Sequence, residues 1–251
     1  MTNPSIERTI NALHAITDRA EREGSRIGYF SALYARVTAA VARGLRAGFF
    51  EDEDRMERLD VAFADLYLDA ATRYLRREES ASLSWGVAFD ACAQENLTVL
   101  QHIYLGMIAH VLVDLPLGAA QTCPGEAIDG LEGDFYRIND VVRSEMNAFH
   151  DDLRRVSPAL AGWDTGLWGV MSRGTLFAGR RIAFREARAL AMAAPQERAS
   201  LLTRNDRVAT WLGRTVVLGG GARRFFHQVR ATECCDVRQV IRALRGQQLE
   251  G

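Results

Sequence analysis

The chain has 251 residues, of which 48% are hydrophobic and 25% are charged. This apolar fraction is that of a globular protein with a sizeable buried core, and it excludes disorder as the main state. The formal net charge of −1 argues against a general nucleic-acid-binding protein, which needs a surplus of basic residues.

Helical periodicity dominates the sequence, because apolar residues recur at steps of three and four and no segment shows the sustained alternation of a strand. The predicted helices cover about residues 6–20, 28–47, 54–74, 85–92, 95–115, 134–155, 175–193, 195–218 and 223–245, the last with a break near residue 232. We therefore expect an all-α helical bundle of roughly eight to ten helices. It is expected to form a single domain over residues 1–251, since no linker is long or polar enough to divide it.

Five residues set the expected helix ends. Gly48 and Gly219 suit the left-handed conformation that closes a helix, and Pro195 suits a first turn. Ser84 is predicted to cap the short helix that follows it. Pro116 is predicted to end or kink the apolar helix before it, because proline has no amide donor.

The compartment predicted from the sequence is the cytoplasm. Residues 1–8 lack the apolar segment of a signal peptide. The cysteines are too sparse for a disulfide scaffold and follow no CxxC spacing; they are Cys92, Cys123, Cys234 and Cys235. The most apolar stretch, residues 97–120, is interrupted by polar groups, so we expect a buried core helix there and no membrane span.

The most informative feature of the sequence is the pair His110 and Asp114. Residues four apart on a helix project from the same face, so the imidazole and the carboxylate are expected to point together. Their neighbours are apolar, which places both polar groups inside the bundle. Burial of such groups is costly unless they are hydrogen-bonded, bound to a metal or used in catalysis.

Three interpretations of this pair remain open. Asp114 can orient His110 as a general base, or both residues can ligate one divalent metal ion, namely zinc, iron or manganese. The third interpretation is a core hydrogen bond that fixes helix packing. Asp60 lies on a predicted helix beside apolar residues and is the expected additional metal ligand. His102 is an expected catalytic residue at another depth of the same cavity, eight residues before His110.

Several segments together resemble domain-of-unknown-function family 5995, a family of uncharacterised, mainly microbial proteins. The segments are 56–64, 105–116, 134–139 and 185–191, within a resemblance that spans about residues 44–193. In the family pattern an Asn often follows the histidine by two residues, where this chain has Leu112. The resemblance implies no reaction. It does imply a shared polar site, because the following residues fall inside its motifs: Asp60, His110, Asp114, Asp134 and Asn139.

We therefore expect a small-molecule enzyme with a buried polar cavity lined by His110, Asp114 and Asp60. The predicted chemistry is metal-assisted or general acid–base, such as hydrolysis, cyclisation or elimination of a mostly apolar substrate. No nucleic-acid or membrane partner is expected, and a homodimer is left open. The alternative is a non-catalytic helical module that binds a hydrophobic ligand or a partner protein through an open apolar groove.

Overall fold

The computed structural model describes residues 4–163, 176–233 and 236–247, and this part of the chain contains helices and no strand. The α-helices are α1 (Pro4–Glu23), α2 (Ile27–Arg46), α3 (Glu53–Arg76), α4 (Leu83–Ala91), α5 (Val99–Ala109), α6 (Leu115–Thr122), α7 (Glu132–Val156), α9 (Leu176–Met192), α10 (Pro195–Leu218), α11 (Arg223–Thr232) and α12 (Val237–Leu244). A π-helical turn, η1 (His110–Asp114), joins α5 to α6. The 3₁₀ turns are η2 (Gly125–Leu131), η3 (Pro158–Trp163) and η5 (Gly220–Ala222).

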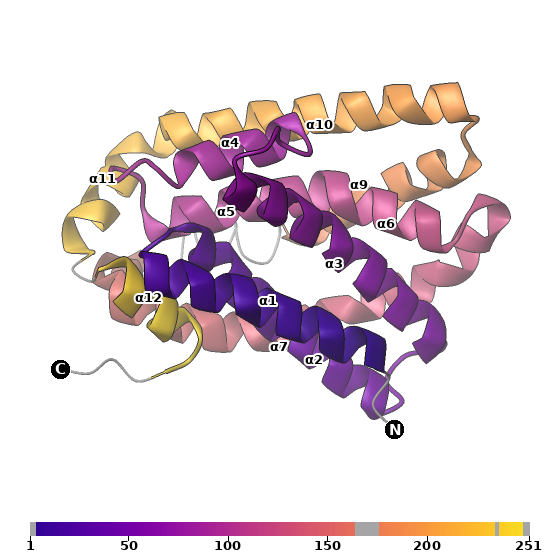
Figure 1. The fold of residues 1–251 in the computed structure, drawn as a ribbon, viewed down its shortest axis with the longest axis horizontal. Helices are drawn as coiled ribbons and strands as arrows, with labels where there is room; N and C mark the ends of the chain where they lie inside the picture. Colours follow the sequence, from indigo (N-terminus) through magenta and orange to yellow (C-terminus); the bar gives the residue numbers. More distant parts are fainter. Residues whose placement is uncertain (1–3, 164–175, 234–235, 248–251) are drawn as a thin grey trace.

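The expected fold class is confirmed. With Val99–Thr122 counted as one continuous helix, the described residues form ten α-helices, at the upper end of the predicted number. Figure 1 shows α10 along one edge of the molecule with α4 packed against it, and α1 and α2 side by side on the other. Of the four cysteines, Cys234 and Cys235 lie outside the described residues.

Three of the five expected helix ends agree with the structure. Gly48 and Gly219 have φ angles of +65° and +77°, as expected for residues that close a helix, and Pro195 is the first residue of α10. The prediction for Ser84 was wrong. The cap is Ser82, whose side chain accepts a hydrogen bond from the Trp85 amide, because Ser84 already lies inside the first turn.

The helix around Pro116 differs from its prediction at both ends. It begins at Val99, because Thr98 forms a capping box with Gln101. It does not end at Pro116 but continues to Thr122 through η1, where the amide of Leu115 donates to the carbonyl of His110, five residues back. Pro116 has no backbone N–H, so it cannot donate a hydrogen bond to a carbonyl one turn earlier in the helix. The wider π turn accommodates this missing donor.

The continuous run Val99–Thr122 is long and apolar enough to cross a membrane by length and composition. However, 67% of its most apolar window is buried inside the protein. Other helices of the same chain therefore cover most of this surface, as they cover the core helix of a bundle.

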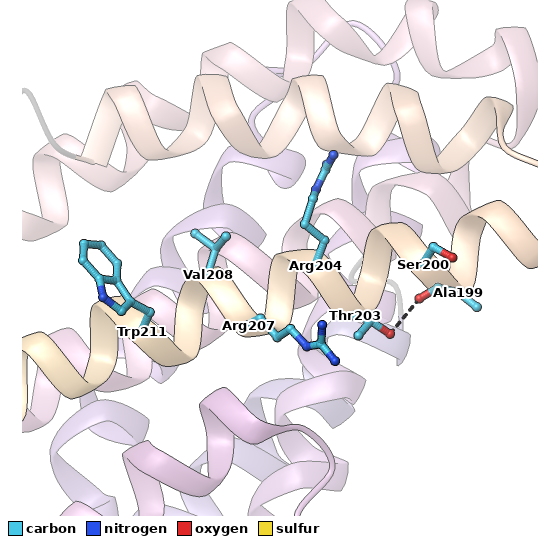
Figure 2. A pocket seen from close by; sticks show the side chains of 7 residues that line it. All are labelled: Ala199, Ser200, Thr203, Arg204, Arg207, Val208 and Trp211. Carbon is cyan, nitrogen blue, oxygen red and sulfur yellow. Dashed lines mark hydrogen bonds between the residues drawn. The ribbon is translucent and has the colours of Figure 1, made fainter.

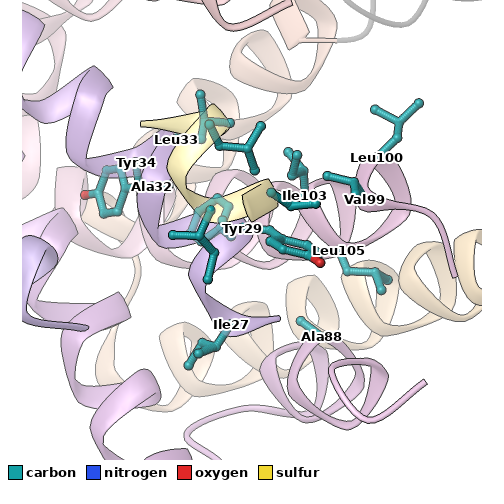
Figure 3. Close-up of a cluster of buried hydrophobic side chains, with 14 of the residues drawn as sticks. Ile27, Tyr29, Ala32, Leu33, Tyr34, Ala88, Val99, Leu100, Ile103 and Leu105 are labelled. Atoms are coloured by element: carbon teal, nitrogen blue, oxygen red, sulfur yellow. The ribbon is translucent and has the colours of Figure 1, made fainter. Parts of the chain in front are cut away.

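Two apolar clusters form the core, and η1 lies where they meet. The first contains Leu105 and Ala109 of α5, together with the α2 and α5 side chains drawn in Figure 3. The second contains Leu115 and Ala119 of α6. Phe63 of α3 packs against both clusters. The π turn thus places His110 and Asp114 at the junction of the two clusters.

One glycine permits the close approach of α2 to α5 beside this junction. A Cβ atom on Gly106 would lie 2.4 Å from Cγ of Phe30, nearer than side-chain atoms approach one another. Phe30 in turn contacts the ring of His110, with 5.6 Å between ring centroids. Gly106 therefore fixes the position of an aromatic ring against the histidine.

We predict that Gly106→Ala lowers the free energy of unfolding by about 1–3 kcal/mol, because the added methyl group overpacks the contact with Phe30. Urea denaturation followed by circular dichroism measures the change. Gly86→Ala is the matched control, since a Cβ on Gly86 of α4 would meet only Ser80, at 3.6 Å. Equal stability changes in both variants would contradict the prediction.

Candidate functional site

His110 and Asp114 are hydrogen-bonded and buried. Nδ1 of His110 lies 2.9 Å from Oδ2 of Asp114, and each residue is only 4% exposed. The four-residue spacing therefore brings the two side chains together, as predicted from the sequence. Because η1 joins α5 and α6 without a break, both groups are carried by one rigid helical run.

Trp85 is a third member of the site that sequence reasoning did not identify. Its indole Nε1–H donates to Oδ2 of Asp114 at 3.0 Å. The start of α4 is held in place by Asp206 of α10, whose carboxylate accepts hydrogen bonds from the amides of Leu83 and Ser84. No local signal could reveal this role, since an apolar helix with one Trp is equally typical of a core segment.

Aromatic rings enclose the imidazole of His110. Phe63 stacks on it with a centroid separation of 3.6 Å and an angle of 12° between the planes. Tyr34 meets it edge-on at 4.3 Å, and the rings of Phe30, Tyr67 and Trp85 lie between 5.6 and 6.2 Å away. Side chains from α2, α3 and α4 therefore lie directly beside the ring, and the buried polar cavity expected around His110 stays a prediction.

Several polar atoms in this aromatic cluster have no hydrogen-bond partner. Buried side-chain atoms without a partner are exceptions in proteins, because each loses its hydration without compensation. They include Oδ2 of Asp60 and Nε2 of His110. The hydroxyls of Tyr34 and Tyr67 also lack a well-formed hydrogen bond, although the side chains of Thr38 and Ser31 lie close enough to act on their pKa values. Such a concentration of unpaired atoms distinguishes this region from an ordinary apolar core.

Asp60 belongs to this cluster but does not touch the His110–Asp114 pair through a hydrogen bond. It is 5% exposed, and burial, helped by the nearby charge of Glu57, raises the pKa of its carboxyl to about 7. The pKa of the Tyr34 phenol is raised by burial and further by the carboxylates of Asp60 and Asp114. Tyr34 thus lies within the field of both carboxyl groups.

Burial disfavours the charged form of both members of the pair. It lowers the pKa of His110 well below its usual value and raises the pKa of Asp114 well above its own, which the hydrogen bond from Trp85 only partly offsets. Since Oδ2 of Asp114 already accepts from Trp85, we infer that Nδ1–H of His110 also donates to it. The lone pair of the imidazole then resides on Nε2, the unpartnered nitrogen.

His102 lies apart from the pair, behind the aromatic rings. It packs edge-on against Tyr29 at 5.7 Å and lines a small cavity of about 10 Å³ that Phe30, Tyr67 and Trp85 also line. This volume holds about one water molecule. Burial, followed by the positive charge of Arg26, lowers the pKa of His102 to about 3. The rings therefore separate His102 from His110, whereas the sequence predicted a shared cavity.

Asp134, a motif residue of the family resemblance, holds the loop between α2 and α3. Its fully buried carboxylate accepts hydrogen bonds from the amides of Glu51 and Asp52, at 2.8 and 3.0 Å, and from the side chain of Arg55. Although burial raises the pKa of Asp134, these hydrogen bonds outweigh it and lower the pKa overall. Asp134 is therefore part of a structural anchor at the start of α3.

A larger cavity lies on the outer face of α10. It has a volume of about 600 Å³ and includes Arg204, Val208 and Trp211, whose side chains extend from the helix in Figure 2. Val208 and Trp211 are 50% and 66% exposed. This cavity contains neither His110 nor Asp114, so it is a separate feature of the surface.

The comparison with known families covers most of the chain. Residues 6–218 match the model of a family of unknown function, DUF5995. The chain belongs to the DUF5995 family. No curated protein and no solved structure gives a significant match. The DUF5995 match includes α3, α4 and η1, and hence Asp60, Trp85, His110 and Asp114. It confirms the resemblance found in the sequence, and the family description assigns no reaction.

The low pKa of His102 predicts a specific pH dependence of stability. As the pH falls below about 6.5, the unfolded chain binds a proton at His102 and the folded chain does not, so the folded state loses stability down to about pH 3. Between pH 8 and pH 5 we expect His102 to lower the free energy of unfolding by about 2 kcal/mol, and His102→Phe to remove this loss. Urea denaturation at pH 8 and pH 5 measures the difference. The same change of pH dependence in the exposed variant His14→Gln would contradict the assignment.

Proposed function

We propose that this protein is a small-molecule enzyme in which His110 acts as a general base. One observation carries the proposal: Nδ1 of His110 is bound to Asp114, while Nε2 is buried without a partner. A histidine kept only for packing would gain from a hydrogen bond at both nitrogens. A free Nε2 behind an Asp–His hydrogen bond is the arrangement that general-base catalysis uses.

Each residue of the site has a defined part in this chemistry. Nε2 takes a proton from the substrate or from an attacking water, and the imidazolium that forms is stabilised by Asp114. Trp85 fixes the carboxyl of Asp114 through its indole N–H. Asp60, with a pKa of about 7, is able to supply a proton to a leaving or rearranging group. Hydrolysis, cyclisation and elimination all use such a base and acid.

The side chains around the imidazole of His110 favour a mostly apolar substrate. Phe30, Phe63 and Trp85 present apolar ring surfaces to the imidazole, and the Tyr34 hydroxyl is an unpaired polar group that a substrate oxygen could bind. Because His110 is 4% exposed, entry of a substrate requires these rings to move. Movement of side chains or lids before the chemical step is common in enzymes.

A metal-assisted version of the proposal uses Nε2 of His110 as a ligand, with Asp114 hydrogen-bonded behind it. The side chains available as metal ligands give the metal-assisted version less support. Among the described residues, no group of three or more His, Cys, Asp or Glu side chains is arranged to hold an ion. Asp60 would have to approach His110 to complete a site. We therefore favour acid–base chemistry.

Metal analysis of the purified protein separates the two versions. We predict no stoichiometric zinc, iron or manganese, and catalytic turnover that is unchanged by EDTA, since Nε2 acts on the substrate itself. Inductively coupled plasma mass spectrometry measures the metal content. A bound ion that is lost in His110→Ala would establish the metal-assisted version instead.

Removal of the base tests catalysis directly. We predict that His110→Gln and Asp114→Asn each lower turnover by about 10²–10⁴-fold, the usual contribution of a general base. Conversion of a panel of small apolar esters, lactones and β-hydroxy ketones is measured by mass spectrometry. His14→Gln is the matched control, because the exposed His14 of α1 repeats the four-residue spacing with the partly exposed Asp18. Circular dichroism verifies that each variant is folded.

Two results would refute the enzyme proposal. The first is wild-type turnover by folded His110→Gln. The second is the absence of turnover of every compound in the panel by the wild-type protein. In either case the hydrogen bond between His110 and Asp114 serves to fix the packing of η1 against α4.

The alternative from another class is a non-catalytic module that binds an apolar ligand. The exposed Trp211 and Val208 on the cavity of α10 favour it. A fluorescent apolar probe such as anilinonaphthalene sulfonate distinguishes the two. If the protein is a binding module, Trp211→Ala abolishes binding of the probe and His110→Gln leaves it intact. If the protein is an enzyme acting through His110, Trp211→Ala leaves turnover unchanged.

A further inference from the structure

A further cavity lies between α7 and α9, and arginines dominate its wall. It has a volume of about 450 Å³, which is within the range of small-molecule sites. The side chains that matter for its chemistry are Glu132 and Tyr136 of α7 and Arg181, Ile182, Arg185 and Arg188 of α9. None of these residues belongs to the aromatic cluster around His110.

The positive charges of this wall are not all compensated. Arg185 forms an ion pair with Glu186 at 3.1 Å, and Arg188 forms one with Asp129 at 2.8 Å. Arg181 has no carboxylate within ion-pair distance in the described part of the chain, and Glu132 is the acidic residue of the wall. Arg181 therefore presents an exposed, unpaired guanidinium to the cavity.

A second cation without a carboxylate partner, Arg180, precedes Arg181 on α9. Arg180 is 5% exposed; it donates from Nη2 to the carbonyl of Phe135 at 2.9 Å, and its guanidinium carbon lies 4.6 Å from the centroid of the Phe135 ring. Its Nε atom is buried without a partner, and no carboxylate pairs with it among the residues that the structure describes. Burial lowers the pKa of Arg180 to about 10, and Tyr136 acts against this shift. The group remains charged at neutral pH.

A buried charge without a counter-charge is expensive, because desolvation is not repaid by an ion pair. Arg180 precedes Arg181 on α9, and it packs on Phe135, which precedes the wall residue Tyr136 on α7. An anion bound in the cavity would pair with Arg181, and its charge would also offset that of Arg180 one residue earlier on α9. The apolar surface of Ile182, which is 44% exposed, provides contact for an uncharged part of the same molecule.

We propose that the cavity between α7 and α9 binds a small organic anion that combines a phosphate or carboxylate group with an apolar body. Arg181 binds the anionic group directly, and its planar fork of donors matches either acid. Arg180, one residue earlier on the same helix, adds to the positive potential. The site is independent of the His110 chemistry, so His110→Gln is expected to bind the anion as the wild type does.

Isothermal titration calorimetry at fixed ionic strength tests the site, with phenyl phosphate and benzoate as probes for the two acids and inorganic phosphate for the headgroup alone. We expect phenyl phosphate or benzoate to bind the wild type at least tenfold more tightly than inorganic phosphate. We expect Arg181→Ala to weaken that binding at least tenfold. The control is Arg224→Ala, which removes an exposed arginine from α11. Absence of binding by both organic probes, or equal weakening in the control, would overturn the proposal.

Arg180→Met distinguishes a ligand-binding role from a structural one. Methionine fills a similar volume without the buried charge, so we expect a higher melting temperature together with anion binding that is at least threefold weaker. A lower melting temperature with unchanged binding would show that Arg180 serves packing against Phe135 and would overturn its part in the site. If Arg180→Met fails to fold, the Arg181→Ala titration still decides whether the anion binds.

Discussion

The hydrogen bond between His110 and Asp114 is the interaction around which the rest of the core is arranged. An imidazole and a carboxyl group in the interior would each be strongly unfavourable alone, and pairing them removes most of that penalty. The pair occupies the junction of the two apolar clusters, on the π turn that links α5 to α6. Trp85 extends the network to α4, so one polar contact fixes the relative position of separate helices.

Burial gives this pair its chemistry and also limits access to it. The aromatic rings of Tyr34 and Phe63 exclude water, which keeps His110 neutral and leaves Nε2 as a free acceptor. The same rings occupy the space that a substrate would need. Function at this site therefore depends on side-chain movement, and the residues that define the substrate are the ones that must move.

The two proposed sites use uncompensated polar groups in opposite ways. Around His110 the unpaired atoms are acceptors and hydroxyls in an apolar setting, which suits proton transfer. Between α7 and α9 the unpaired groups are the guanidiniums of Arg180 and Arg181, which suit an anion. Nε2 of His110 and Nε of Arg180 are both buried without a partner, and a folded chain retains such a group only at a cost in stability.

Local sequence determined the helices and the pairing of His110 with Asp114. Apolar periodicity, the turn glycines Gly48 and Gly219 and a four-residue spacing are all properties of one helix, so they can be read from neighbouring residues. Only the tertiary structure decided that Trp85 joins the pair, that Phe63 stacks on the imidazole and that His102 faces the other side of the rings. These contacts join different helices, and their geometry depends on close packing, which sequence spacing does not encode.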